Sequence, residues 1–211
     1  MKVRFWYIKA YDNIFEEMYR LKQYEAQQSW LPWFKNPYYT EEKIKQYMDN
    51  LKQWREVREE KIINTIEEIF GSPFKKKYIV CHCVWYYHKF AWLSHPLTVC
   101  VWSNKDIDKI GLVLLHELIH IKQNEWEENE YFEKYTHYLR EKEKINDYST
   151  ISHILLYTAM YYICNKVWLG DIYKTESNVN KWTPHHVAWD YIHKHWYENI
   201  WKSYQDLKNK L

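Results

Sequence analysis

Apolar residues recur at helical spacing over most of this 211-residue chain. Between residues 40 and 70 they lie three or four positions apart, with Ile44 and Leu51 among them. Thr40, followed by two glutamates, is a typical helix start, and the Gly-Ser-Pro sequence at 71–73 is a typical stop. The pattern therefore predicts one long amphipathic helix over about 40–70.

Further helices are predicted on both sides of this one. Asn13 can cap a helix that runs to about Gln28, and the two prolines within residues 30–37 then predict a loop. A threonine–proline pair at 183–184 is a typical start for the last helix. From Asn129 onward the helical spacing predicts three helices, at about 129–144, 149–168 and 184–208.

The composition of strands is found in three short segments. Residues 78–87 and 97–103 are rich in Val, Ile, Trp, Tyr and Cys, and the intervening loop contains Ser-His-Pro at 94–96. We expect these two segments to pair as a hairpin. Residues 1–8 are expected to form a first strand, so the predicted sheet is an N-terminal strand plus a hairpin.

The composition as a whole restricts the classes of function. A net charge of +2 creates no field that would favour nucleic acid or an anionic membrane. No long uncharged apolar stretch is present, so no transmembrane helix is expected. Residues 1–8 lack the apolar region and cleavage site of a signal peptide. We expect one domain over 1–211, mostly helical in about 1–73, with the hairpin and further helices in 74–211, in a cytoplasmic protein.

The four cysteines are too few and too unevenly spaced for a secreted disulfide scaffold. Strand alternation places Cys81 and Cys83 on one face with Ile79 and Trp85, where thiols behave as small apolar groups. Cys164 lies in an apolar helical stretch. We therefore expect buried thiols rather than a metal site.

The most informative motif is His-Glu-Leu-Ile-His at residues 116–120, which has the HExxH pattern. Residues four apart share one face of a helix, so His116 and His120 can present two imidazoles to one metal ion. Glu117 lies beside them, where its carboxylate can accept a proton from a metal-bound water. The motif therefore predicts a metal-dependent hydrolytic site.

The flanking residues indicate that the motif lies on a buried helix. Residues 110–115 are apolar, and so are the two central residues of the motif. Asn104 or Asp106 is a candidate N-cap. The polar run Lys-Gln-Asn-Glu at 122–125 is expected to mark the end of the buried part.

A strand followed by an HExxH helix and further helices resembles the catalytic core of zincin-type zinc metallopeptidases, over about residues 76–170. The resemblance implies His116 and His120 as ligands of one zinc ion and Glu117 as the general base. It also implies a zincin-like α+β fold, mainly helical, with the small sheet packed on the HExxH helix. In such proteins the strand before that helix, here 97–102, can pair with an extended peptide.

Two zincin subgroups are excluded by the residues after the motif. Metzincins require HExxHxxGxxH, but Ile-Lys-Gln-Asn-Glu-Trp at 121–126 lacks both the glycine and the third histidine. The NExxSD pattern of thermolysin-like enzymes is absent downstream. The closer likeness is to small intracellular HExxH proteins whose third ligand lies on a following helix.

A third protein ligand is expected because catalytic zinc usually has three, with one position left for water. His153 is favoured, since it enters a largely apolar helix where a polar side chain needs a partner. His137, Glu130 and Glu133 are the alternatives. His137 lies in a charge-rich segment that is typical of a solvated helix.

The last predicted helix carries a second group of histidines. His185 and His193 share a face with tryptophan and isoleucine residues, so either ring can point inward. An inward imidazole would either stabilise the oxyanion of a tetrahedral intermediate or simply pack among aromatic side chains. Asp190, one turn after His186, can orient that ring.

The leading hypothesis is a zinc-dependent, metallopeptidase-like hydrolase with a peptide or protein substrate and Glu117 as general base. The alternative is a catalytically inactive zinc-binding protein with a regulatory or interaction role and a zincin-like fold. An open fourth coordination position favours the first, and a fourth protein ligand favours the second. Nucleic-acid binding by stacked aromatic residues is not expected, given the low net charge.

Overall fold

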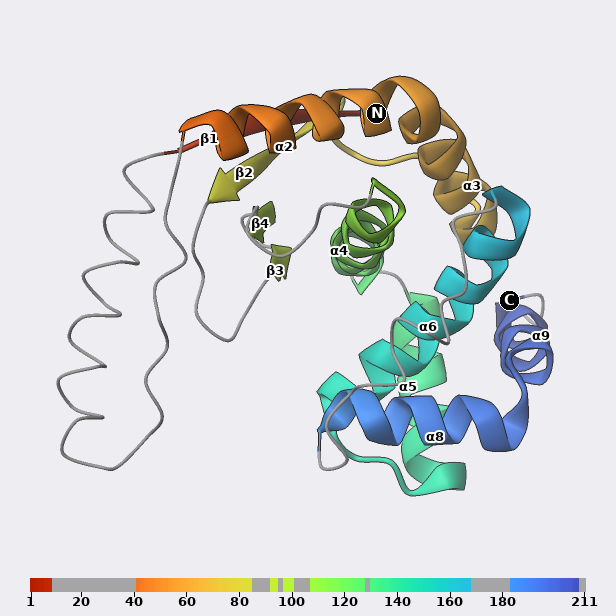
Figure 1. Ribbon diagram of the computed structural model, residues 1–211. Helices are drawn as coiled ribbons and strands as arrows, with labels where there is room; N and C mark the ends of the chain where they lie inside the picture. The colour runs from red at the N-terminus through yellow and green to blue at the C-terminus, as the bar shows by residue number, and fades with distance from the viewer. Residues whose placement is uncertain are drawn as a thin grey trace, which may run out of the picture. The chain divides into compact units, whose positions relative to one another are not determined.

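The computed structural model describes residues 1–8, 41–84, 92–94, 97–100, 107–127, 130–167 and 183–208 (Figure 1). Its elements are β1 (Lys2–Tyr7), α2 (Glu41–Trp54), η1 (Arg55–Glu59), α3 (Glu60–Phe70), β2 (Tyr78–Val84), β3 (Trp92–Ser94), β4 (Leu97–Cys100), α4 (Ile107–Glu127), α5 (Glu130–Glu143), α6 (Tyr148–Val167), α8 (Pro184–His195) and α9 (Tyr197–Lys208). The described residues are thus mainly helical with one small sheet, as predicted. The zincin-like character of the fold stays a prediction.

Several predicted features fall outside the described residues. They are the helix at 13–28, the loop at 30–37, the candidate caps Asn104 and Asp106, and Trp85.

The chain divides into two compact units, and each is built from two stretches of sequence. The first comprises Met1–Glu60 and Lys76–Leu114, and it contains the sheet. The second comprises Lys61–Lys75 and Leu115–Leu211, and it contains the HExxH residues and the helices that follow them. The expectation of a single domain stays a prediction.

The sheet has four strands in the order β1-β2-β4-β3. β1 pairs with β2 in parallel, from Lys2 opposite Tyr78 to Tyr7 opposite Cys83. β2 also pairs in parallel with β4, whereas β3 is antiparallel to β4. The predicted first strand is therefore confirmed and forms one edge of the sheet.

The predicted hairpin between residues 78–87 and 97–103 is wrong. These segments contain β2 and β4, which run parallel to each other. The hairpin instead joins β3 to β4, because the three residues 92–94 form an additional antiparallel strand. Alternation of side chains predicts a strand but does not specify the direction of its neighbour, which is why the pairing was mistaken.

The inward face of the sheet is apolar, as the alternation predicted. Val3 on β1 and Ile79, Cys81 and Cys83 on β2 are buried. Cys164 on α6 is buried as well, and all three of these cysteines are free thiols. They contribute to the core as small apolar groups.

The helix predicted at 40–70 is confirmed, since α2, η1 and α3 follow one another directly. The middle segment, η1, has the wider π-helical hydrogen bonding. Gly71 ends α3 in the left-handed conformation, with a φ of 71°. Its N–H and that of Ser72 donate to the carbonyls of Glu68 and Glu67, which is a typical glycine helix end.

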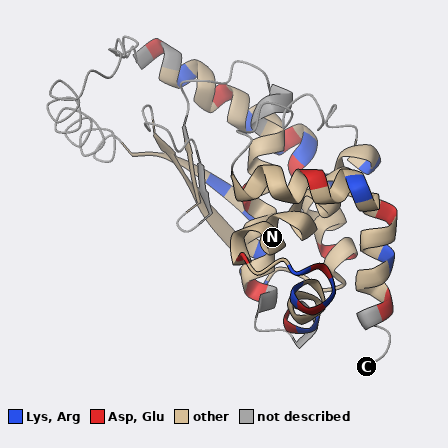
Figure 2. Cartoon of the chain, turned by 90° about the horizontal axis from the view of Figure 1, so that it is seen from below, with Lys and Arg blue, Asp and Glu red and all other residues tan. Residues whose placement is uncertain are grey.

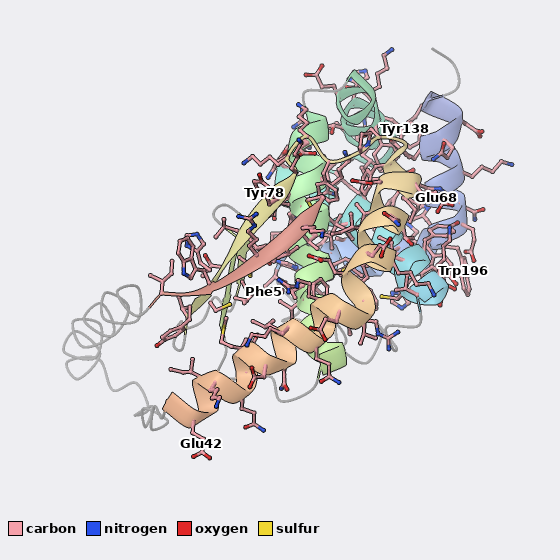
Figure 3. The ribbon with its side chains drawn as sticks, turned by 90° about the horizontal axis from the view of Figure 1, so that it is seen from above. Phe5, Glu42, Glu68, Tyr78, Tyr138 and Trp196 are labelled. Carbon is pink, nitrogen blue, oxygen red and sulfur yellow. The ribbon has the colours of Figure 1, made fainter. Side chains whose placement is uncertain are left out.

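Its first two segments, α2 and η1, pack against the first strand (Figure 3). Phe5 and Trp54 meet edge to face, with ring centroids 5.9 Å apart. The buried carboxylate of Glu59, on η1, accepts a hydrogen bond from the backbone N–H of Val3. Burial raises the pKa of Glu59, and the hydrogen bond from Val3 opposes that rise. The π-helical segment thus carries the side chain that anchors β1.

Helix α6 is the most deeply buried element of the second unit. Nearly all its residues from Thr150 to Met160 are shielded from solvent, including the polar Ser152 and His153. A helix that is apolar on all sides must be surrounded by other elements. Helices α8 and α9 both pack against α6 and against each other.

The helix predicted at 184–208 is interrupted. Trp196 separates α8 from α9 and has a φ of 61° and a ψ of 130°. Its N–H still donates to the carbonyl of Ile192, and its own carbonyl accepts from the N–H groups of Asn199 and Ile200. The apolar spacing continues through this break, so periodicity alone could not reveal it.

The distribution of charged residues and the hydropathy of the described helices agree with the expectations from the sequence. Acidic and basic residues are interspersed over the described helices rather than gathered by sign (Figure 2). None of the helices that the structure describes is long and apolar enough to cross a membrane.

Candidate metal centre

The HExxH residues lie on α4, in its second half. The rings of His116 and His120 are one helical turn apart, with centroids separated by 4.9 Å. Leu115, Leu118 and Ile119 around them are fully buried, as expected for a buried helix. Both histidines retain partial exposure, so a metal ion bound there would be accessible from one side.

His153 on α6 completes a cluster of three histidines. One ligand atom from each of His116, His120 and His153 can be chosen so that all three atoms lie within 4.8 Å of one another. The ring of His153 is 4.8 Å from that of His120 and 5.7 Å from that of His116, measured between centroids. The three side chains are therefore close enough to bind a metal ion.

Two of the three alternatives for the third ligand lie on an exposed helix face and outside this cluster. His137 and Glu133 lie on the exposed face of α5. The side chain of Glu130 is not among those described. His153 is thus the candidate whose predicted proximity to the motif is confirmed.

Two of the three imidazoles are oriented by hydrogen bonds through Nδ1. In His120, Nδ1 lies 3.1 Å from Oε1 of Gln123, and in His153 it lies 2.7 Å from the carbonyl oxygen of Ser149. Both partners are acceptors, so Nδ1 carries the proton and the lone pair of each ring lies on Nε2. This is the usual arrangement of metal-binding histidines, in which one nitrogen binds the metal and the other donates to an oxygen.

Gln123 is a residue of the site that the sequence analysis missed. Its Nε2 donates to the carbonyl of Ser152 (2.9 Å), and its Oε1 accepts from the Ser152 hydroxyl (3.2 Å) as well as from His120. It therefore joins α4 to α6 at the cluster. A signal was present: Gln123 follows His120 by three residues, so it lies on the same helical face.

The expectation that residues 122–125 end the buried part of α4 is wrong for the first two of them. Lys122 and Gln123 are both buried. The Lys122 ammonium donates to the carbonyl of Pro73 (2.7 Å) and lies 3.5 Å from the Glu125 carboxylate. It also lies over the ring of Phe74. Pro73 and Phe74 are distant in sequence, and Glu125 lies one turn further along α4. Together these partners make the burial of a lysine possible.

Two of the three histidines, His116 and His153, are held in the neutral form. Burial lowers the pKa of His116 well below its usual value, and the neighbouring histidines lower it further. Burial, with His185 and His120, lowers the pKa of His153 to about 3. Neutral imidazole is the form that binds metal ions, so these two histidines need no deprotonation to do so at neutral pH.

Glu117 is buried beside His116 on the same helix. Burial raises the pKa of its carboxyl group to about 8. A carboxyl group with a raised pKa is suited to accept and release a proton near neutral pH. A cation bound nearby would favour its ionised form.

The structure brings one of the C-terminal histidines to the cluster and leaves two away from it. The ring of His185 packs on that of His153, with centroids 3.8 Å apart. His186 forms a 3.3 Å contact with Asp190 near the surface, as the sequence suggested. His193 is exposed, and its Nδ1 lies 2.9 Å from the carbonyl of Trp189.

Comparisons with protein-family models, with curated proteins and with solved structures find no match for this chain. The resemblance to zincin-type metallopeptidases therefore depends on the HExxH residues and their surroundings alone.

Proposed function

We propose that this protein binds one zinc ion through His116, His120 and His153 and hydrolyses peptide bonds. The observation that supports the proposal is the convergence of three histidines from two helices, with ligand atoms within 4.8 Å of one another. Only two of these histidines belong to the HExxH motif. The third, His153, comes from a helix that the motif does not include, so its proximity to the other two supports the metal site independently of the motif.

The donor set suits zinc and disfavours magnesium and calcium. Imidazole nitrogens suit zinc, copper, iron and nickel, whereas magnesium and calcium prefer oxygen ligands. Three protein ligands leave a fourth position for water in tetrahedral zinc, which is the usual composition of a catalytic site. The neutral state of His116 and His153 fits this role.

The proposed reaction divides its tasks among the residues of the cluster. Zinc, when bound, lowers the pKa of a coordinated water and polarises the carbonyl of the peptide. Glu117 accepts the proton of the attacking water on its carboxylate and then delivers it to the leaving amine. Gln123 and the Ser149 carbonyl hold the rings of His120 and His153 in the binding orientation.

One observation favours a second candidate function, a zinc-binding protein without hydrolytic activity. The ring of His185 lies close enough to His153 to offer a fourth imidazole. A fourth protein ligand would fill the position that water needs, and the ion would then be structural.

The remaining expectations belong to the same proposal. The substrate is a peptide or a protein, and no nucleic acid is required. We place the protein in the cytoplasm because Cys81, Cys83 and Cys164 are free thiols, which a reducing compartment maintains.

The test combines metal analysis with proteolysis of fluorescein-labelled casein. We expect one zinc ion per chain in the wild type and in Glu117→Gln, and loss of zinc from His120→Ala and His153→Ala. Glu117→Gln should lower proteolysis by roughly 10²–10⁴-fold, because a general base contributes about that much. The exposed Glu133, substituted as Glu133→Gln, is the matched control and should leave both measurements unchanged.

Two results would contradict the proposal. Proteolysis that persists in Glu117→Gln would remove Glu117 from the mechanism. Full zinc content in His153→Ala would place the third ligand elsewhere.

A further inference from the structure

His185 is the fourth imidazole beside the candidate metal centre. Its ring centroid lies 3.8 Å from that of His153 and 6.0 Å from that of His116, and it is nearly parallel to the His116 ring. It is contributed by the first turn of α8, which Thr183 caps by accepting a hydrogen bond from the N–H of His186. The position is therefore fixed by a helix start rather than by a loose segment.

The hydrogen bond of His185 differs in kind from those of the candidate ligands. Its Nδ1 lies 2.8 Å from the hydroxyl of Tyr157, which is buried on α6 one turn after His153. The ring of Tyr157 is held in turn by Trp189, with centroids 5.4 Å apart. A tyrosine hydroxyl can donate a hydrogen bond, whereas the amide and carbonyl oxygens beside His120 and His153 can only accept one.

These partners bear on which nitrogen of each ring carries the proton. Acceptors at Nδ1 place the lone pairs of His120 and His153 on Nε2, the nitrogen that can bind a metal ion. A tyrosine hydroxyl can donate to Nδ1 of His185, and a neutral His185 then carries its proton on Nε2. The three histidines whose ligand atoms lie within 4.8 Å of one another are His116, His120 and His153, and His185 is not part of that group.

We propose that His185 lies outside the coordination sphere and donates a hydrogen bond from Nε2 to the oxygen of a substrate bound at the open metal position, with Tyr157 as the positioning residue that donates to Nδ1. A fixed donor aimed at a developing negative charge stabilises it without reorganisation. This inference depends on the proposed metal site, but it does not depend on which substrate is hydrolysed.

The test uses cobalt-substituted protein and acetohydroxamate, a small ligand whose oxygens bind to metal ions. The visible spectrum of cobalt reports both the ligand set in the resting protein and the binding of the probe. We expect His185→Leu to raise the Kd of acetohydroxamate roughly tenfold or more, as for loss of a hydrogen bond to a charged oxygen. The resting spectrum and the cobalt stoichiometry should stay unchanged.

Two further variants and a control separate this role from simple packing. Tyr157→Phe should also raise the Kd of acetohydroxamate, because it removes the hydroxyl that donates to Nδ1 of His185 while it keeps the aromatic ring. His185→Gln should restore part of the affinity, because an amide N–H can replace the imidazole donor. His186→Leu, one residue away on α8 and outside the cluster, should bind the probe like the wild type.

The outcomes distinguish the alternatives. An unchanged Kd in His185→Leu would refute the donor role. A changed resting spectrum with weaker cobalt binding would show that His185 is a fourth ligand, and it would also refute the donor role. Wild-type protein that binds no cobalt would overturn the metal centre and this inference together. Cobalt binding without casein hydrolysis would overturn only the proposed peptidase activity.

Discussion

Gln123 serves as a partner for two different groups at the candidate metal centre. Its amide oxygen accepts from the Nδ1–H of His120 and from the Ser152 hydroxyl, and its amide nitrogen donates to the Ser152 carbonyl. It thereby fixes both the ring orientation of one histidine and the position of α6 beside α4. Groups that orient metal-binding histidines in this way contribute to metal affinity without touching the ion.

We predict that Gln123→Leu weakens zinc binding by about 10–100-fold, which is typical for loss of a group that orients a ligand. The leucine keeps the volume of the side chain but leaves Nδ1 of His120 without this acceptor. Competition with a fluorescent zinc chelator measures the change. Asn124→Ala, at the exposed next position, is the control. Equal affinities for the Gln123→Leu variant and the wild type would show that the hydrogen bond to His120 is dispensable.

Of the residues at the candidate metal centre, His153 could be predicted from the sequence and Gln123 could not. It could be predicted as the third ligand because a histidine within a buried apolar helix needs a polar partner. Gln123 could not be recognised in the same way, because it stands in a polar run that is typical of a solvated helix end. Its burial depends on α6, which lies elsewhere in the chain.

At the scale of elements, the break between α8 and α9 is the feature that side-chain periodicity could not predict. Trp196 has a φ of 61° and a ψ of 130°, a combination that is favourable for glycine and costs roughly 1–3 kcal/mol for other residues. Its indole is largely exposed. The residue thus bears a conformational cost that its burial does not offset.

We predict that Trp196→Gly is more stable than Trp196→Ala by about 1 kcal/mol in chemical unfolding. Both variants lose the indole and its contact with Tyr197, so the comparison isolates the backbone term. Alanine retains a Cβ that is crowded at positive φ, whereas glycine does not. If the alanine variant were equally stable or more stable, the positive φ at this position would carry no strain.

The strands show the same division between what periodicity predicts and what it leaves open. Residues 1–8, 78–87 and 97–103 were predicted as strands because they alternate and are rich in β-branched and aromatic residues. The structure places β1, β2 and β4 there. Their parallel arrangement is a property of the connections between them, and β3 is too short to give a periodic signal.

At the scale of the whole molecule, burial of a carboxyl group makes stability depend on pH. The pKa of Glu117 is raised to about 8 in the folded protein, whereas the ordinary pKa of a glutamate side chain is 4.5. Between these two values the folded chain keeps a proton that the unfolded chain releases. The stability associated with this group is therefore fully present below pH 4.5 and is lost as the pH rises toward 8.

We predict that Glu117→Gln changes this dependence in metal-free protein prepared with a chelator. The variant should gain about 2.5 kcal/mol in unfolding free energy relative to wild type between pH 5 and pH 7, since each pH unit corresponds to about 1.4 kcal/mol. Urea unfolding at the two pH values measures it. The exposed Glu133→Gln substitution should change the unfolding free energy by the same amount at both pH values. A constant difference between wild type and Glu117→Gln would mean that the carboxyl group is hydrated in the folded state.

The fold of the helical part follows closely from the sequence, and the site follows in part. The long helix at 41–70 and the helices α5 and α6 were predicted because their apolar faces repeat over many turns. The sequence predicts that either His185 or His193 points inward, and the structure has His185 against His153. Tertiary packing of α8 on α6 selects between them, and no local pattern encodes that choice.

The register of the first strand has a consequence for the order of folding. Lys2 pairs with Tyr78, and Val3 pairs with Ile79, so within the described sheet the pairing of β1 requires that the chain has been synthesised through β2. The helix at 41–70 requires only local contacts and can form earlier, whereas closing the long connection between the two strands is entropically slow. β1 is therefore made well before β2, the strand with which it pairs, and is expected to be among the last described elements to become ordered.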